Sequence, residues 1–232
     1  MHSKQAGYDN NYLNHFNGNH LSAKGYLILT WAHVQAYYCQ PSLGSKIYVE
    51  LLPGMKHYNE NLPKGDNGGA LQIMQPHTEN DLGSADLMLY TGLNCDGTTS
   101  SCLWGGGRVS SIGIVCKDSA YNKYKQSINM WGSSYAMYGE SVAHEIAHQL
   151  GIHHDHDTRN GGTGNSLTST NDCNGKGLMS YGHHLRVWSS CSKANFEAYY
   201  SEEKNNWCMQ GISIAITGTP RLVLFQLVQS PI

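Results

Sequence analysis

Residues 144–155 read HEIAHQLGIHHD. His144 and His148 are four positions apart, so on a helix both imidazoles emerge on one face and can bind the same metal ion. Glu145 points beside that face, where its carboxylate can act as a general base without being a ligand. The remaining apolar positions give this helix surface to bury, so packing would fix it in place. The stretch therefore predicts a buried helix that carries a metal site.

Gly151 tolerates the left-handed conformation that ends a helix, and the redirected chain can bring His154 to the same ion. Three neutral imidazoles leave one position of a tetrahedral zinc ion open for water, as in catalytic rather than structural sites. The reaction predicted is hydrolysis of a peptide bond without a covalent intermediate. A single histidine is more often solvated or packed in the core, but three at this spacing argue against that alternative. His153 and His156 lie outside the ligand register, and we expect both to be exposed loop residues.

The stretch fits H-E-x-x-H-x-x-G-x-x-H at all five fixed positions and resembles the metzincin metalloproteases. These proteases also have a methionine turn beneath the metal, and residues 177–181 (GLMSY) look like it, with Met179 as the turn methionine. Tyr181 lies two residues further on, where astacins and serralysins carry a tyrosine that binds zinc as an extra ligand. The alternative for Tyr181 is a ring that packs at the cleft wall.

Asp155, directly after the third histidine, is similar to the adamalysin or reprolysin branch, which includes ADAM proteases and venom metalloproteases. Residues 84–89 (SADLML) are similar to the strand of that branch before the cleft, and residues 111–115 (SIGIV) are similar to a further segment of it. Residues 188–192 (WSSCS) are similar to the start of its terminal helix. The resemblance therefore indicates an adamalysin-like enzyme.

The resemblance implies an α/β (α+β) fold. This is the two-lobed metzincin catalytic domain, with a mixed twisted sheet, long helices above the zinc cleft and a smaller irregular lower lobe that ends in a helix. Residues 1–151 would form the upper lobe with the zinc helix, and residues 152–210 the lower lobe with the third zinc histidine, the methionine turn and the C-terminal helix. Residues 211–232 have no counterpart. Family members begin with a strand before the first helix, and we expect the sheet here to lack that strand.

Hydrophobic periodicity predicts several helices and strands. The predicted helices span residues 21–39 and 138–150, and the predicted strands span residues 47–51, 86–92 and 112–116. Ser192 is a candidate N-cap for a late helix. Residues 1–20 are polar without a clear period. Residues 53–80 are rich in Gly, Asn and Pro, and predict at most a short helix around residues 70–74.

The length of 232 residues suits one compact domain with two lobes about a cleft. A net charge of −2 with only 14% charged residues leaves no basic stripe, so nucleic acid is excluded as a partner. No apolar run reaches membrane-spanning length, because Pro220 and Arg221 interrupt the nearest one, at residues 212–228. We therefore expect no membrane partner. The motif and the family resemblance imply protein or peptide substrates, and we expect a monomer.

Seven cysteines without a CxxC pair favour disulfides and an oxidising compartment, with zinc-thiolate ligation as the weaker alternative. Because the number is odd, one thiol is left over. The pairs that the family resemblance suggests are Cys173 with Cys191 and Cys116 with Cys208, with Cys95 to Cys102 as a local loop and Cys39 unpaired. The first residues, MHSK, lead into a polar stretch rather than a signal peptide, so we expect the mature or truncated portion of a longer secreted precursor.

In the family, an extended substrate pairs with the edge strand of the upper sheet. Our candidate for this strand is Leu103, Trp104 and Gly105, within residues 103–107 (LWGGG), whose glycines permit close backbone approach. The alternative is a flexible loop, which three consecutive glycines favour. The segment after Met179 would wall the pocket for the residue that follows the scissile bond.

The function predicted from these residues is a secreted zinc-dependent endopeptidase. One catalytic ion would be bound by His144, His148 and His154. Glu145 would take a proton from the attacking water and later deliver it to the leaving amine. The alternative is a non-catalytic zinc-containing toxin or matrix-binding domain. Glu145 argues against that alternative, because a purely structural site has no use for a base.

Overall fold

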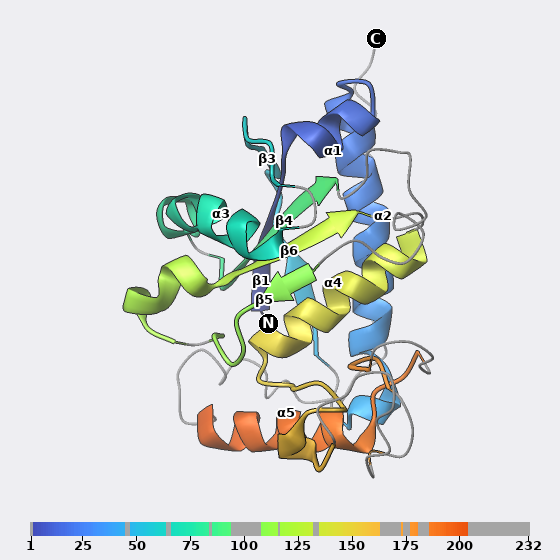
Figure 1. The fold of residues 1–232 in the computed structure, drawn as a ribbon. Coiled ribbons are helices and arrows are strands. Elements are labelled where there is room, and N and C mark those ends of the chain that lie inside the picture. Colours follow the sequence, from blue (N-terminus) through green and yellow to red (C-terminus); the bar gives the residue numbers. More distant parts are fainter. Residues whose placement is uncertain are drawn as a thin grey trace.

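The computed structural model describes residues 2–44, 47–63, 66–83, 85–93, 108–115, 117–131, 135–162, 173, 177–180 and 186–203. These residues form a mixed α/β fold with helices packed around one central sheet (Figure 1). Among them, no helix combines the length and apolar character needed to cross a bilayer.

The central sheet is mostly parallel. Its strands in chain order are β1 (His2–Tyr8), β2 (Val49–Leu51), β3 (Lys56–His57), β4 (Leu87–Leu93), β5 (Arg108–Ser110) and β6 (Gln126–Trp131). The order across the sheet is β2-β1-β4-β6-β5, and β3 also pairs with β1. Strand β5 runs antiparallel to β6, whereas the pairings of β1 and β4 are parallel. The antiparallel strand therefore lies at one edge.

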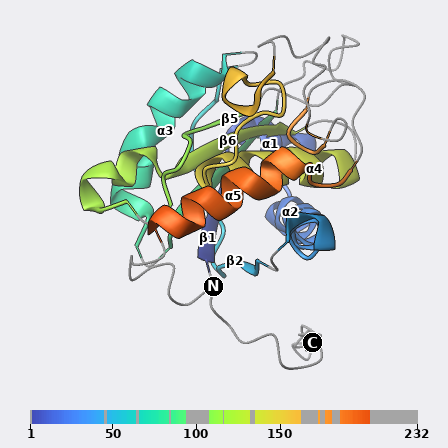
Figure 2. The same cartoon turned by 90° about the horizontal axis from the view of Figure 1, so that it is seen from below.

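Helices cover both faces of the sheet (Figures 1 and 2). They are α1 (Asn10–His15), α2 (His20–Tyr38), α3 (Asn67–Asp81), α4 (Tyr135–Gln149) and α5 (Ser190–Glu203), with short 3-10 turns η1 (Pro41–Leu43), η3 (Ser119–Tyr124) and η4 (Thr158–Asn160). Helix α3 packs on one face, α2 and α4 pack on the other, and α5 lies at the lower end in Figure 1.

Strand β4 shows how the two faces are filled. Leu87 and Leu89 belong to the apolar cluster that contains α2 and α4, whereas Met88 and Tyr90 belong to the cluster that contains α3. Successive side chains of a strand point to opposite faces, so this continuous apolar run is buried on both sides.

Helices α2 and α4 cross closely at Gly139. A Cβ atom at Gly139 would lie 2.6 Å from Cβ of His33, so only glycine permits this approach of the two backbones. Further along, the hydroxyl of Tyr38 donates a hydrogen bond of 2.7 Å to the carbonyl of Ala143. The helix that carries the histidines is therefore held against α2 just before His144.

The expectation that the sheet lacks its first strand is wrong. Strand β1 lies inside the sheet and pairs with β2, β3 and β4. Pairing with several neighbours satisfies its backbone groups, so it needs no alternating apolar pattern to be a strand. Because the sequence of β1 is polar, hydrophobic periodicity did not predict this strand.

Helix α3 is also much longer than the short helix expected around residues 70–74. The carboxylate of Asp66 caps it by accepting a hydrogen bond of 2.8 Å from the backbone N–H of Gly69. Ala70, Met74 and Thr78 are buried one turn apart on the face that meets the sheet. This packing outweighs the low helix propensity of the glycines and of Pro76.

The strand predicted at residues 112–116 is not formed by the described residues 112–115. Gly113 has a φ of 62°, which breaks extended backbone. The N–H groups of Gly113 and Ile114 instead donate to the carbonyls of His148 and Gln149, at 2.8 Å and 3.0 Å. The segment thus caps the end of α4, and the strands in this part of the chain are β5 and β6, which the periodicity did not predict.

The predictions of α2, β2, β4 and α4 are confirmed to within a few residues at their ends. The late helix is present as α5, but its N-cap differs from the predicted one. The hydroxyl oxygen of Ser189 accepts a hydrogen bond of 3.0 Å from the N–H of Ser192, so Ser189 is the cap and Ser192 lies in the first turn.

Candidate metal centre

Three imidazoles converge at the C-terminal end of α4. His144 and His148 lie one turn apart on the helix, and Nε2 of His154 is 3.1 Å from Nε2 of each. His144 and His148 are buried, and His154 is half-buried. Tetrahedral zinc with Zn–N bonds of about 2.0–2.1 Å separates its nitrogen ligands by about 3.3 Å. The two distances to His154 are close to that value, and the ligand atoms of all three histidines lie within 4.8 Å of one another, so the cluster can hold one metal ion.

The opposite ring nitrogens show which tautomers are present. Nδ1 of His144 is 3.0 Å from the carbonyl of Leu178, and Nδ1 of His148 is 2.7 Å from the carbonyl of Ile152. A carbonyl only accepts, so each Nδ1 carries the proton and each Nε2 presents a lone pair. Lone pairs that point at one centre repel each other unless a cation lies between them, so this donor set fits a metal ion.

Burial keeps these imidazoles neutral. It lowers the pKa of His144 well below its usual range, that of His148 to about 4 and that of His154 to about 3. Burial is the largest cause of each shift, and the positive charge of Arg108 contributes to the lowering of all three pKa values. At neutral pH each ring is therefore neutral and keeps one unprotonated nitrogen, as metal binding requires.

The turn after α4 brings the third histidine to the other two. Gly151 has a φ of 83°, its N–H donates to the carbonyl of His148 at 2.8 Å, and the N–H of Ile152 donates to the carbonyl of Ala147 at 2.9 Å. This pair of bonds is a Schellman motif, with glycine at its left-handed position. The motif reverses the chain so that His154 faces the helix.

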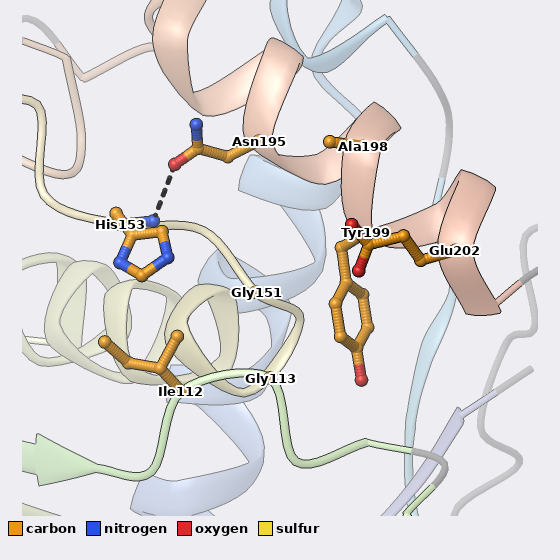
Figure 3. A pocket seen from close by; sticks show the side chains of 8 residues that line it. All are labelled: Ile112, Gly113, Gly151, His153, Asn195, Ala198, Tyr199 and Glu202. Atoms are coloured by element: carbon orange, nitrogen blue, oxygen red, sulfur yellow. Dashed lines mark hydrogen bonds between the residues drawn. The ribbon is translucent and has the colours of Figure 1, made fainter. Parts of the chain in front are cut away.

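Helix α5 packs against the outer side of this turn, where Figure 3 shows a hollow lined by both elements. A Cβ atom at Gly151 would lie 2.6 Å from Cγ of Tyr199. The backbone N–H of His153 donates to the side chain of Asn195 at 3.0 Å. The end of α4 and the approach to His154 are thus supported from the lower part of the molecule.

Asp155 connects the third histidine to two distant segments. Its Oδ2 atom accepts hydrogen bonds of 2.9 Å from the N–H of Gly177 and from the hydroxyl of Ser180. Its Oδ1 atom accepts one of 2.5 Å from the hydroxyl of Ser189. Its own N–H donates to the carbonyl of Met179 at 3.2 Å. The carboxylate is buried, so these donors replace the water it has lost.

Met179 lies in a tight turn. The N–H of Ser180 donates to the carbonyl of Gly177 at 3.0 Å, and Met179 is fully buried. The carbonyl of Leu178, the residue before it, accepts a hydrogen bond from Nδ1 of His144. The described part of the predicted turn, residues 177–180, is therefore in contact with the histidine cluster through its backbone.

The carboxylate of Glu145 is buried at the edge of the histidine cluster. Its Oε1 atom is 3.9 Å from Nε2 of His144 and 3.7 Å from Nε of Arg108. The hydroxyl of Ser110 lies 2.7 Å from its Oε2 atom. Sequence reasoning did not single out Arg108 or Ser110, because one polar pair in a short strand forms no motif. The only signal in the sequence was that Arg108 and Ser110 occupy alternate positions, on either side of Val109.

Some of the remaining predicted site residues lie in the described part of the chain, and others lie outside it. Cys173 and Cys191 form a disulfide with their Cα atoms 5.1 Å apart, and Cys39 is a free thiol. The residues that lie outside the described part of the chain are Tyr181, Leu103, Trp104, Gly105, Cys95, Cys102, Cys116 and Cys208. His156 is not the exposed residue expected, because its ring is buried and stacks on His154 with centroids 4.8 Å apart.

The fold and the histidine site together define a metallopeptidase type of architecture. The Reprolysin_5 model of metallo-peptidase family M12 matches residues 6–194. The match covers most of the chain, so the chain belongs to metallo-peptidase family M12, and the predicted resemblance to reprolysins is confirmed.

Comparisons with curated protein sequences and with solved structures do not indicate a function. No curated protein sequence matches the chain. A chain in a solved structure described as "Structure of a chaperone-substrate complex" has a similar fold, with 18% sequence identity and a TM-score of 0.52. The alignment covers 81% of this chain but only 31% of that one. At such low identity the likeness concerns the fold alone.

Proposed function

We propose that this chain is a zinc-dependent endopeptidase that hydrolyses peptide bonds of extracellular proteins. One observation supports this most directly. Three neutral histidine nitrogens converge on a point beside a buried carboxylate, with Oε1 of Glu145 only 3.9 Å from Nε2 of His144. A purely structural zinc site would have no use for that carboxylate. Membership of metallo-peptidase family M12 agrees with this proposal.

In the proposed reaction, His144, His148 and His154 hold one zinc ion. When bound, zinc supplies a Lewis acid that polarises the substrate carbonyl and lowers the pKa of water. Glu145 accepts a proton from the attacking water and delivers it to the leaving amine. Because Glu145 is 2% exposed, its carboxylate is largely shielded from bulk water.

The substrate would bind along the antiparallel edge of the sheet. Strand β5 pairs with β6 on one side, and among the described residues no strand pairs with its other side. An extended peptide can add to such an edge through backbone hydrogen bonds. We propose that residues 103–105 prolong this edge. We also propose that Tyr181, after the methionine turn, is an extra ligand or part of the cleft wall.

The Cys173–Cys191 disulfide supports secretion, because disulfides persist in oxidising compartments. We propose that the enzyme is a secreted monomer. Residues 1–151 would form the upper lobe of its cleft and residues 152–210 the lower lobe. The disulfide joins the start of α5 to the segment before the methionine turn, both within that lower lobe.

The decisive test is Glu145→Gln, which keeps the size of the side chain but removes the base. We expect bound zinc to stay at one ion per chain while kcat/KM on a fluorogenic peptide library falls by about 100- to 10,000-fold. Glu197→Gln, on the exposed face of α5, is the matched control and should leave both quantities unchanged.

Three outcomes bear on the proposal. Loss of parent activity on chelation, with recovery on adding zinc, would support it. A fully active Glu145→Gln protein with its zinc intact would refute the role of the carboxylate. A zinc-loaded parent that cleaves no peptide in the library would favour the non-catalytic zinc-containing domain instead.

A further inference from the structure

Strand β5 places two polar side chains on the carboxylate of Glu145. We infer that Arg108 and Ser110 are positioning residues that hold this carboxylate in its reactive orientation, so that the substrate-binding edge strand also sets the geometry of the base. The inference rests on the proposed function, since it concerns the same reaction.

The contacts reach both oxygens of the carboxylate. Ser110 Oγ is 2.7 Å from Oε2 of Glu145 and 2.9 Å from its backbone carbonyl, so the hydroxyl can donate to either. Nε of Arg108 is 3.7 Å from Oε1. Oε1 is also the oxygen 3.9 Å from Nε2 of His144. The carboxylate thus lies between strand β5 and the histidine cluster.

The register of the sheet explains why both side chains point this way. In the antiparallel pair, Arg108 lies opposite Asn129 and Ser110 lies opposite Ser127, whereas Val109 lies opposite Ile128. Ile128 belongs to the apolar cluster on the α3 face, and Val109 packs against that cluster. Alternation therefore directs Arg108 and Ser110 to the other face, which α4 covers.

Arg108 also contacts the preceding turn of α4. Its Nη1 atom donates a hydrogen bond of 3.3 Å to the hydroxyl of Ser141. Ser141 and Glu145 are four residues apart, so they lie on the same face of the helix. One guanidinium thus bridges two positions of α4, and its side chain is only 20% exposed. This bridge restricts the movement of strand and helix relative to each other.

A general base works only if it is held close to its productive geometry, within about 0.5 Å and 10–20°. The long side chain of Glu145 has several rotatable bonds, and its backbone position alone does not fix the carboxylate. A hydrogen bond to a charged group is worth about 1.5–3 kcal/mol. Removal of the Ser110 hydroxyl should therefore lower kcat by about 10- to 100-fold.

The test compares Ser110→Thr with Ser110→Val in the zinc-loaded chain. The two replacements have the same shape, but only threonine keeps the hydroxyl. We expect Ser110→Val to lower kcat by about 10- to 100-fold while KM changes less than threefold. Ser110→Thr should keep kcat within about threefold of the parent, at equal zinc content and equal melting temperature.

A second comparison asks whether Ser110 acts through Glu145. In a Glu145→Asp background the shortened carboxylate no longer reaches the hydroxyl, so Ser110→Val should lower the remaining kcat less than threefold. A role of Ser110 in strand stability alone would lower activity equally in both backgrounds. If Ser110→Val does not fold, Ser110→Ala removes the hydroxyl with less bulk and takes its place.

The outcomes separate the two proposals. An active parent whose Val and Thr variants have equal kcat would overturn the positioning role and leave the proposed function intact. Equal losses in the parent and Glu145→Asp backgrounds would also overturn it. A zinc-loaded parent without peptidase activity would overturn the proposed function, and the positioning role with it.

Discussion

Nδ1 of His144 lies 3.0 Å from the carbonyl oxygen of Leu178, the residue before Met179. This bond joins the helix that carries two of the histidines to a turn more than thirty residues further along the chain. It fixes the ring so that its Nε2 atom faces the other two imidazoles. The proposed zinc site is therefore assembled by contacts between α4 and the segment after it.

Asp155→Ala should destabilise the protein strongly. The change leaves the N–H of Gly177 and the hydroxyls of Ser180 and Ser189 without their buried acceptor. We expect a loss on the order of 3–5 kcal/mol in the free energy of unfolding, measured by urea titration of the zinc-loaded protein. Asp157→Asn is the matched control, because asparagine caps a helix as well as aspartate does. A loss below 1 kcal/mol for Asp155→Ala would contradict this role.

Gly151→Ala should weaken both the fold and metal binding. The residue has a φ of 83°, and the new Cβ atom would lie 2.6 Å from the ring of Tyr199. Strain at such a position costs about 1–3 kcal/mol, and displacement of the turn would move His154. We expect a lower melting temperature and weaker zinc binding by competition with a chromophoric chelator.

Gly25→Ala provides the control for that change. Gly25 lies inside α2, and a Cβ atom there meets nothing within 4 Å. Alanine should raise stability by about 0.5–1 kcal/mol, because glycine is unfavourable inside a helix. Equal melting temperatures for the two variants would argue against the importance of the Gly151 turn.

The zinc-free protein should lose stability as the pH falls below about 6.5. The pKa of His148 is lowered to about 4 in the folded protein. Between about pH 6.5 and about pH 4, His148 is therefore protonated in the unfolded chain but not in the folded chain. Each fall in pH through this range therefore lowers the free energy of unfolding. For His148 alone the loss is on the order of 3 kcal/mol once the pH is below about 4.

Urea unfolding of the zinc-free protein between pH 7 and pH 4 measures this slope. His144 and His154 have lowered pKa values too, so they steepen it in the same direction. His148→Gln should make the slope shallower, because glutamine does not titrate. A slope unchanged by this substitution would show that His148 is not the neutral buried group described above.

Reduction of the Cys173–Cys191 disulfide should destabilise the lower part of the molecule. The two cysteines are 18 positions apart in sequence, and a cross-link of that length is worth about 3 kcal/mol. The double variant Cys173→Ser, Cys191→Ser should melt at a lower temperature and become insensitive to reductant. Non-reducing peptide mapping that linked Cys173 to any other cysteine would contradict the pairing.

Much of the site followed from the sequence because its determinants are local. The four-residue step from His144 to His148 needs only a helix, and Gly151 needs only its own backbone freedom to reverse the chain. Helices α2 and α4 and strands β2 and β4 have apolar patterns strong enough to predict them. The same motif also led to the metallopeptidase family that the comparison confirms.

Other features depend on contacts between segments far apart in the chain. Strand β1 is polar and becomes a strand because three neighbours pair with it, and α3 tolerates Pro76 because the sheet covers its apolar face. The ring orientation of His144 depends on the carbonyl of Leu178, which a distant segment supplies, whereas the carbonyl that orients His148 comes from Ile152 in the turn next to the helix. The contact of Arg108 and Ser110 with Glu145 exists only once β5 pairs antiparallel with β6. The sequence by itself thus determined the kinds of groups at the proposed metal centre, whereas tertiary packing decided their orientation, since orientation depends on neighbours that no local pattern specifies.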